Sequence, residues 1–133
     1  MATKWGLNLP SDLFVPRLIK YLDQHNPQPS LVHGDLWKGN AAVNEKGQGV
    51  IFDPAVWWAD REVDIAMTKL FGGFSKDFYD AYQDTWPMKC NYEQRIDIYN
   101  LYHLLNHANL FGGNYMHQSL SLLNQINIFL EKY

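Results

Sequence analysis

The sequence predicts an α+β domain that is mostly α-helical, and three observations support this fold class. Apolar residues recur at helical spacing over most of the chain. Two short apolar runs flank a turn-like segment at residues 44–49, which indicates one β-hairpin. The length of 133 residues is typical of one domain. We therefore expect residues 1–133 to form a single domain in which helices surround a hairpin.

The first predicted element is a short amphipathic helix near the N-terminus. Ser11 or Asp12 can cap it, and the two prolines within residues 26–29 end it, because proline cannot continue the helical hydrogen bonds. Leu31 and Val32 then begin an extended segment. The apolar stripe of the helix consists of Leu13, Val15, Leu18, Ile19 and Leu22.

The hairpin is predicted from the apolar runs 41–43 and 50–52. Residues 44–49 read Asn-Glu-Lys-Gly-Gln-Gly, a composition typical of a turn. From Glu62 onward the apolar period becomes helical, and this helix is expected to stop at the glycines 72–73. Further helices are predicted at about 75–86, 92–111 and 115–131.

Composition and charge exclude several classes of function. The formal net charge is −3, so we expect neither nucleic acid nor an anionic membrane as a partner, because both require a basic face. No window is apolar enough to cross a bilayer. The single cysteine, Cys90, excludes an internal disulfide, and the chain does not start with an apolar signal segment. The predicted location is cytoplasmic.

Residues that carry chemistry are concentrated in the run 33–40, which reads His-Gly-Asp-Leu-Trp-Lys-Gly-Asn, and in Asp53. Phosphoryl transfer needs a carboxylate that orients the attacking hydroxyl, and oxygen ligands that hold Mg²⁺. Asp35 precedes Asn40 by five residues, which is the spacing of the catalytic Asp and Asn in the kinase signature. Asp53 follows the second predicted strand, and a hairpin brings that end beside the start of the first strand. The spacing therefore predicts a phosphoryl-transfer site with one metal pocket.

Several segments of the chain together resemble the fructosamine kinase (ketosamine 3-kinase) family, which is grouped with aminoglycoside and choline kinases in a protein-kinase-like superfamily. The most family-specific mark is Trp37 after His-Gly-Asp-Leu. The resemblance spans residues 31–133 and implies the C-terminal lobe of a protein-kinase-like fold, with residues 1–30 as an N-terminal segment that contains a short helix. The resembling segments are 31–40, 51–55, 60–67, 70–74 and 104–107.

The resemblance also implies a role for each residue of the site. Asp35 is implied to be the catalytic base, with Asn40 and Asp53 as Mg²⁺ ligands for ATP. Trp37 offers a flat apolar surface to the substrate.

Four further residues are expected to support the loop. Gly34 and Gly39 would let its backbone approach the phosphates. His33 would brace it through hydrogen bonds, and Asp64 corresponds to an acidic residue that braces the catalytic loop in related kinases.

The other lobe of such a kinase is not found in the sequence. No glycine-rich G-x-G-x-x-G flap and no G-x-x-x-x-G-K motif is present. We therefore expect an isolated C-terminal lobe with the N-lobe absent, and negligible activity of this chain alone. The face that would meet ATP would then be exposed, which favours a homo-oligomer.

Three functions follow from this sequence. The leading one is ATP-dependent phosphorylation of ketosamines, free or protein-bound, which serves deglycation repair in the complete enzyme. The second keeps the kinase but changes the acceptor to an aminoglycoside or a choline-like alcohol. The third is a non-catalytic lobe that binds a partner or dimerises.

Other polar and aromatic residues have simpler explanations. Asp60 and Glu62 open a helix, where carboxylates are favoured by capping and by the helix dipole. His103 and His107 have metal-ligand spacing but lack an evident third ligand, so core or surface positions are expected. Aromatic residues that can line an acceptor pocket, but that more commonly fill a core, are Trp57, Trp58, Tyr99, Tyr102, Phe111 and Tyr115.

Overall fold

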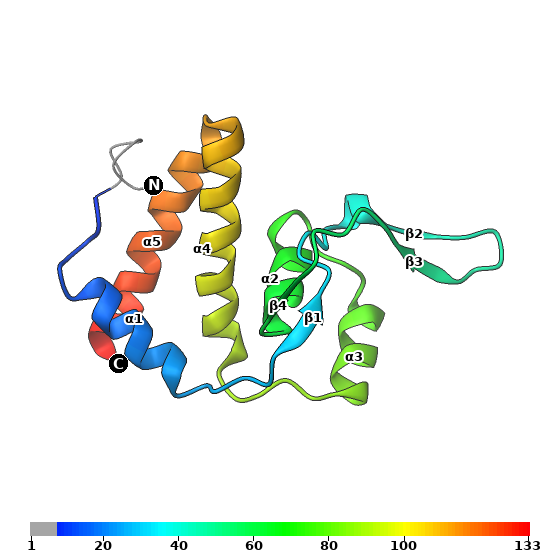
Figure 1. The fold of residues 1–133 in the computed structure, drawn as a ribbon, viewed down its shortest axis with the longest axis horizontal. Coiled ribbons are helices and arrows are strands. Elements are labelled where there is room, and N and C mark those ends of the chain that lie inside the picture. The colour runs from blue at the N-terminus through cyan, green and yellow to red at the C-terminus, as the bar shows by residue number, and fades with distance from the viewer. Residues whose placement is uncertain (1–7) are drawn as a thin grey trace. The chain divides into compact units, whose positions relative to one another are not determined.

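The structure is a computed structural model that describes residues 8–133, so the first seven residues of the expected N-terminal segment lie outside the described part. It is mostly helical with short antiparallel strands, which confirms the predicted α+β class. In order, the elements of Figure 1 are α1 (Phe14–Asp23), β1 (Ser30–Val32), the 3₁₀ turn η2 (Lys38–Asn40), β2 (Ala41–Val43), β3 (Gly49–Ile51), β4 (Trp57–Ala59), α2 (Glu62–Leu70), α3 (Lys76–Thr85), α4 (Tyr92–Phe111) and α5 (Asn114–Lys132).

The chain divides into two compact units. The central unit consists of Gln28–Asn100 and contains the strands, α2, α3 and the first part of α4. The terminal unit combines the chain up to Pro27 with Leu101–Tyr133. The expectation of a single domain over residues 1–133 stays a prediction.

Two antiparallel strand pairs shape the central unit. The predicted hairpin is confirmed as β2 paired with β3, with Ala41 opposite Ile51. The extended segment at Leu31 becomes β1, and its partner is β4, with Leu31 opposite Trp58. β4 was not predicted, because three residues close after Pro54 do not show the alternation that identifies a strand.

The core of the central unit is built on α2. Six of its nine residues are buried, four of them apolar and two, Glu62 and Thr68, polar. Of the apolar stripe that the helical spacing predicts, Val63, Ala66 and Met67 are 3% exposed or less, and Leu70 is half-buried. The core cluster of Ile65, Ala66 and Ile96 is surrounded by the partly buried Phe78, Tyr79, Tyr82, Met88, Tyr92 and Tyr99.

The terminal unit holds α1 against α5. The ring of Tyr21 meets those of Phe129 and Tyr133 edge-on, with centroids 5.2 and 4.9 Å away. Leu123 and Ile126 on α5 are buried at 3% exposure, as their helical spacing predicts. Between residues 8 and 133 no helix has the length and apolar character to span a membrane.

Candidate active site

Asp35 and Asn40 face each other across the turn of the loop at residues 33–40, which we call the catalytic loop. The Asn40 amide nitrogen Nδ2 donates to the backbone oxygen of Asp35 at 3.0 Å and to its carboxylate Oδ2 at 3.2 Å. Both partners can only accept, so the side-chain amide of Asn40 is fixed with its nitrogen toward Asp35. Its Oδ1 is thereby kept as an acceptor. The other carboxylate oxygen of Asp35 has no hydrogen-bond partner among residues 8–133.

His33 links the catalytic loop to the segment after the hairpin. Its Nε2 donates to the carbonyl of Phe52 at 2.8 Å, which makes Nδ1 the acceptor for the backbone N–H of Asp35 at 3.3 Å. The backbone N–H of Ala55 donates to the carbonyl of His33 at 2.8 Å. The ring is 8% exposed, so these bonds are shielded from water. The loop is therefore tied to residues on both sides of Asp53.

Asp64 on α2 holds the catalytic loop from the opposite direction. Its Oδ2 accepts from the backbone N–H of His33 at 2.8 Å, and its Oδ1 accepts from that of Gly34 at 2.9 Å. Bonds to a carboxylate are stronger than those between neutral groups. Asp64 therefore fixes the backbone immediately before Asp35.

Gly34 and Gly39 are required by contacts within the protein. Gly34 has a φ of +83°, and a Cβ there would lie 2.1 Å from the carbonyl oxygen of Ala55. At Gly39 a Cβ would lie 2.2 Å from Cη2 of the Trp37 ring. The sequence analysis assigned these glycines to an approach to phosphates. The structure shows that each glycine also makes room for a neighbouring residue, and the approach to phosphates stays a prediction.

Trp37 lies over Gly39 at the surface of the catalytic loop. Its ring meets that of Phe71 edge-on, with centroids 6.2 Å apart, and the residue is 37% exposed. Trp57 lies close to Gly34, whereas Trp58 is 70% exposed. Trp37 therefore has a fixed orientation and an open face.

Asp53 lies at the same end of the hairpin as Asn40. The backbone N–H of Phe52 donates to the carbonyl of Asn40 at 3.1 Å, so Asp53 is one position beyond this pair. It is exposed, has a left-handed φ of +51°, and makes no side-chain hydrogen bond in the described part of the chain. A free carboxylate and the amide oxygen of Asn40 are the hard oxygen ligands that Mg²⁺ takes in proteins. This donor set fits the predicted metal pocket.

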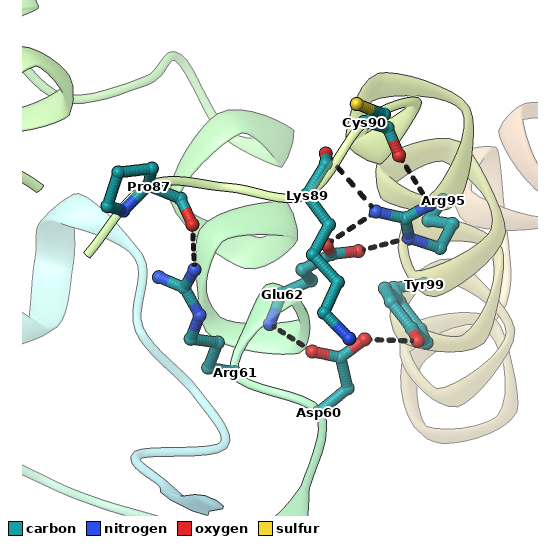
Figure 2. Close-up of polar contacts among 8 residues, drawn as sticks. All are labelled: Asp60, Arg61, Glu62, Pro87, Lys89, Cys90, Arg95 and Tyr99. Atoms are coloured by element: carbon teal, nitrogen blue, oxygen red, sulfur yellow. Dashed lines mark hydrogen bonds and ion pairs between the residues drawn. The ribbon is translucent and has the colours of Figure 1, made fainter. Parts of the chain in front are cut away.

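Two polar contacts at the start of α2 were not predicted (Figure 2). Asp60 Oδ1 accepts from the backbone N–H of Glu62, the first residue of α2, at 3.0 Å, while Arg61 is the N-cap residue. Glu62, however, is 1% exposed and forms a two-bond ion pair with Arg95, with N–O distances of 2.7 and 2.8 Å. Tyr99 donates to Asp60 Oδ2 at 2.7 Å. Burial, followed by this bond to Asp60, raises the pKa of Tyr99 far above its usual range, so the phenol stays a donor.

His103 and His107 lie one turn apart on α4. Nδ1 of His107 donates to the backbone oxygen of His103 at 2.8 Å, one turn earlier on α4. Within residues 8–133, no carboxylate, cysteine or further histidine joins this pair as a third ligand. His103 is buried, and His107 is half-buried.

The sequence matches the family model described as fructosamine kinase over residues 7–129. It is 52% identical over 115 residues to a protein of Vibrio parahaemolyticus named as a probable ketoamine kinase. A Synechocystis protein with the same designation is 51% identical over 126 residues. These matches cover 86% and 94% of this chain, but 40% and 43% of the relatives. The chain thus spans less than half the length of the relatives it matches.

The fold is also similar to solved structures of two bacterial proteins. The first, a provisionally assigned fructosamine-3-kinase of Haemophilus somnus, superposes with a TM-score of 0.81 at 36% identity. A protein of the same designation from Thermobifida fusca gives a TM-score of 0.76 at 34% identity. The similarity covers 94% and 92% of this chain and 43% and 44% of those proteins. The arrangement of strands and helices around the catalytic loop is therefore one found in solved proteins of this type.

Proposed function

The chain belongs to the fructosamine kinase family, and on this premise we propose that it carries the catalytic loop of an ATP-dependent kinase that phosphorylates a hydroxyl of ketosamines. The observation that carries the proposal is the pairing of Asp35 with Asn40. One carboxylate oxygen of Asp35 is held by the Asn40 amide, and the other is left for an acceptor hydroxyl. This is the polar arrangement that phosphoryl transfer requires of a protein.

Asp35 is the base in the proposed step. It orients the acceptor hydroxyl toward the γ-phosphorus of ATP and takes its proton as the new O–P bond forms. The bond between the γ-phosphorus and the bridging oxygen breaks, and ADP leaves with that oxygen. The bond from Asn40 keeps the carboxylate oriented without occupying its second oxygen.

Asn40 and Asp53 are the proposed ligands of Mg²⁺. The ion, when bound, offsets the negative charge that develops on the phosphates. Asn40 is suited to this role because its nitrogen is turned toward Asp35 and its oxygen is left as a ligand. Asp53 supplies a carboxylate at the adjacent end of the hairpin.

A ketosamine is the proposed acceptor. The names of the Vibrio and Synechocystis relatives support this choice over an aminoglycoside or a choline-like alcohol. Trp37 is the proposed contact for the sugar, since its ring is held by Gly39 and Phe71 with one face open. The physiological role that we propose is repair of glycated amines in the cytoplasm, because phosphorylation makes the adduct labile. A panel of the three acceptor classes discriminates between them.

The test uses a chimera in which residues 7–129 replace the matching segment of the Vibrio protein. We expect ATP-dependent phosphorylation of a fructosyl-amine, and a loss of about 10²–10⁴-fold in kcat with Asp35→Asn, the usual contribution of a general base. Asp77→Asn, at an exposed position on α3, is the matched control and should leave the rate unchanged. A chimera whose activity survives Asp35→Asn would contradict the assigned base.

A second candidate is a lobe that binds a partner or a second copy without catalysis. Leu31 and Trp58 favour it, because they lie opposite each other on β1 and β4 and are 61% and 70% exposed. Apolar groups of this size that gather at a surface mark an interaction site. This candidate needs no nucleotide, so an inactive chimera would favour it over the kinase.

A further inference from the structure

The ion pair between Glu62 and Arg95 lies buried where α4 meets the start of α2 (Figure 2). Arg95 donates from Nε and Nη2 to the two carboxylate oxygens of Glu62. Its Nη1 also donates to the carbonyl of Cys90 at 3.0 Å. The two side chains are 2% and 6% exposed. Neither residue reaches the atoms that the proposed transfer uses.

A second contact lies one turn further along α4. Tyr99 follows Arg95 by four residues, so the two side chains lie on one face of the helix. Tyr99 donates to Asp60, and Asp60 in turn accepts from the backbone N–H of Glu62. Two residues of α4 thus hold two carboxylates at the start of α2. We call Asp60, Glu62, Arg95 and Tyr99 the clamp.

The clamp is connected to the catalytic loop through Asp64. Asp64 follows Glu62 by two residues in the first turn of α2, and its two oxygens accept from the backbone N–H groups of His33 and Gly34. Hydrogen bonds weaken steeply when their geometry degrades. A shift of this first turn by about 1 Å would therefore release the loop backbone, a misplacement that can cost about 100-fold in rate.

The free-energy cost of burying the Glu62–Arg95 ion pair indicates the role of the clamp. Removing two charges from water costs free energy that their attraction seldom repays in full. Replacement of a buried ion pair by apolar residues is often neutral or stabilising. Overall stability alone therefore does not account for Glu62 and Arg95, whereas a fixed geometry at the start of α2 does.

We propose that Glu62 and Arg95 are positioning residues for phosphoryl transfer: their ion pair, together with the bond from Tyr99 to Asp60, sets the first turn of α2 so that Asp64 holds the backbone of the catalytic loop. The inference rests on the proposed function for the reaction that it serves. The proposal requires that the Glu62–Arg95 ion pair controls how firmly the backbone amides of His33 and Gly34 are held. This coupling can be measured without any reaction.

The experiment is amide hydrogen exchange by NMR on the 133-residue chain. In Glu62→Gln we expect the amides of His33 and Gly34 to exchange at least tenfold faster and to shift in the spectrum. The amide of Asn44, which donates to Gln48 in the hairpin turn, is the internal reference and should not change. The decisive variant combines Glu62→Leu with Arg95→Met. It should keep the urea midpoint of the wild type, as apolar replacement allows, yet leave the two loop amides unprotected.

Two controls define the result. Asp64→Ala, which removes both acceptor oxygens, should deprotect the same two amides with the clamp intact. Lys76→Met, which removes an exposed lysine paired with Asp80, should change neither. Full protection of His33 and Gly34 in the double apolar variant would overturn the proposal, because the pair would then be merely structural. Unchanged exchange of the His33 and Gly34 amides in Glu62→Gln would also overturn the proposal. No nucleotide is present, so an inactive chimera counts against the kinase and not against the coupling.

Discussion

The catalytic loop and the β2–β3 hairpin meet at Asn40, yet they are held in opposite ways. The loop is anchored from outside itself, by Asp64 on α2 and by the His33 ring. The hairpin is held largely by its own turn, where Asn44 accepts from the backbone N–H groups of Lys46 and Gln48. Most of its strand residues are exposed. One region is fixed by tertiary contacts and the other by local ones.

This difference bears on how the two kinds of proposed site residue work. A base must be held in one orientation, because proton transfer depends on alignment. Asp35 has that support from Asn40 on one side and His33 on the other. A metal ligand can be brought into place by the ion it binds, and Asp53 lies in the exposed segment after the hairpin with a strained φ. The fold thus positions the proposed base in advance and leaves the proposed metal ligand accessible.

Gly34→Ala should have the largest effect on the anchored region. The new Cβ would overlap the carbonyl oxygen of Ala55, and a non-glycine residue at this positive φ is strained. We expect the free energy of unfolding to fall by about 3 kcal/mol, the sum of a backbone clash and a left-handed conformation. Urea denaturation measures this loss. Gly47→Ala in the hairpin turn is the matched control, since its φ is also positive but no atom lies within 4 Å. Equal losses would show that φ strain alone matters at Gly34.

The sequence predicted the elements whose signals are local. The helix at 92–111 was placed at its observed bounds, and the hairpin was found from its turn residues. The residues that meet around the catalytic loop also follow from the run 33–40, since Asn40 contacts Asp35 within one turn. These features depend on spacings of a few residues, and such spacings can be read directly from the amino-acid sequence.

The parts that the sequence did not predict depend on distant partners. Glu62 and Arg95 are 33 residues apart, and no local pattern says that a carboxylate at a helix start is buried against an arginine. The strand β4 was missed for the same reason, because only its pairing with β1 defines it. The need for a glycine at position 34 was predicted, but the close approach of Ala55 was not, because it is visible only in the fold.

Tyr99→Phe should lower the free energy of unfolding by an intermediate amount. It removes a bond to Asp60 that is worth about 1.5–3 kcal/mol for a charged partner. The pKa of Tyr99 is raised in the folded chain by burial and by Asp60. The protonated phenol therefore stabilises the fold below the ordinary tyrosine pKa of about 10 and loses this contribution as pH rises above it.

The measurement for Tyr99 is the free energy of unfolding at pH 7 to 11 for the wild type and the variant. We expect their difference to shrink above about pH 10, because only the wild type loses the contribution of this phenol there. Tyr102, which is 54% exposed, provides the control substitution Tyr102→Phe. A constant difference across this range would mean that Tyr99 does not titrate differently in the two states.

The smallest expected effect is on the exposed hairpin. It is measured with the same substitution, Val→Thr, made in the hairpin and in β1, the strand that leads into the catalytic loop. Val43 on β2 is 69% exposed, so Val43→Thr should change the free energy of unfolding by no more than about 0.5 kcal/mol. Val32 on β1 is 2% exposed, and Val32→Thr should cost about 1–3 kcal/mol because it buries a hydroxyl. Urea denaturation at several protein concentrations compares the two. If Val43→Thr costs as much as Val32→Thr, and more at higher concentration, then a second copy covers the hairpin and the binding candidate gains over the kinase.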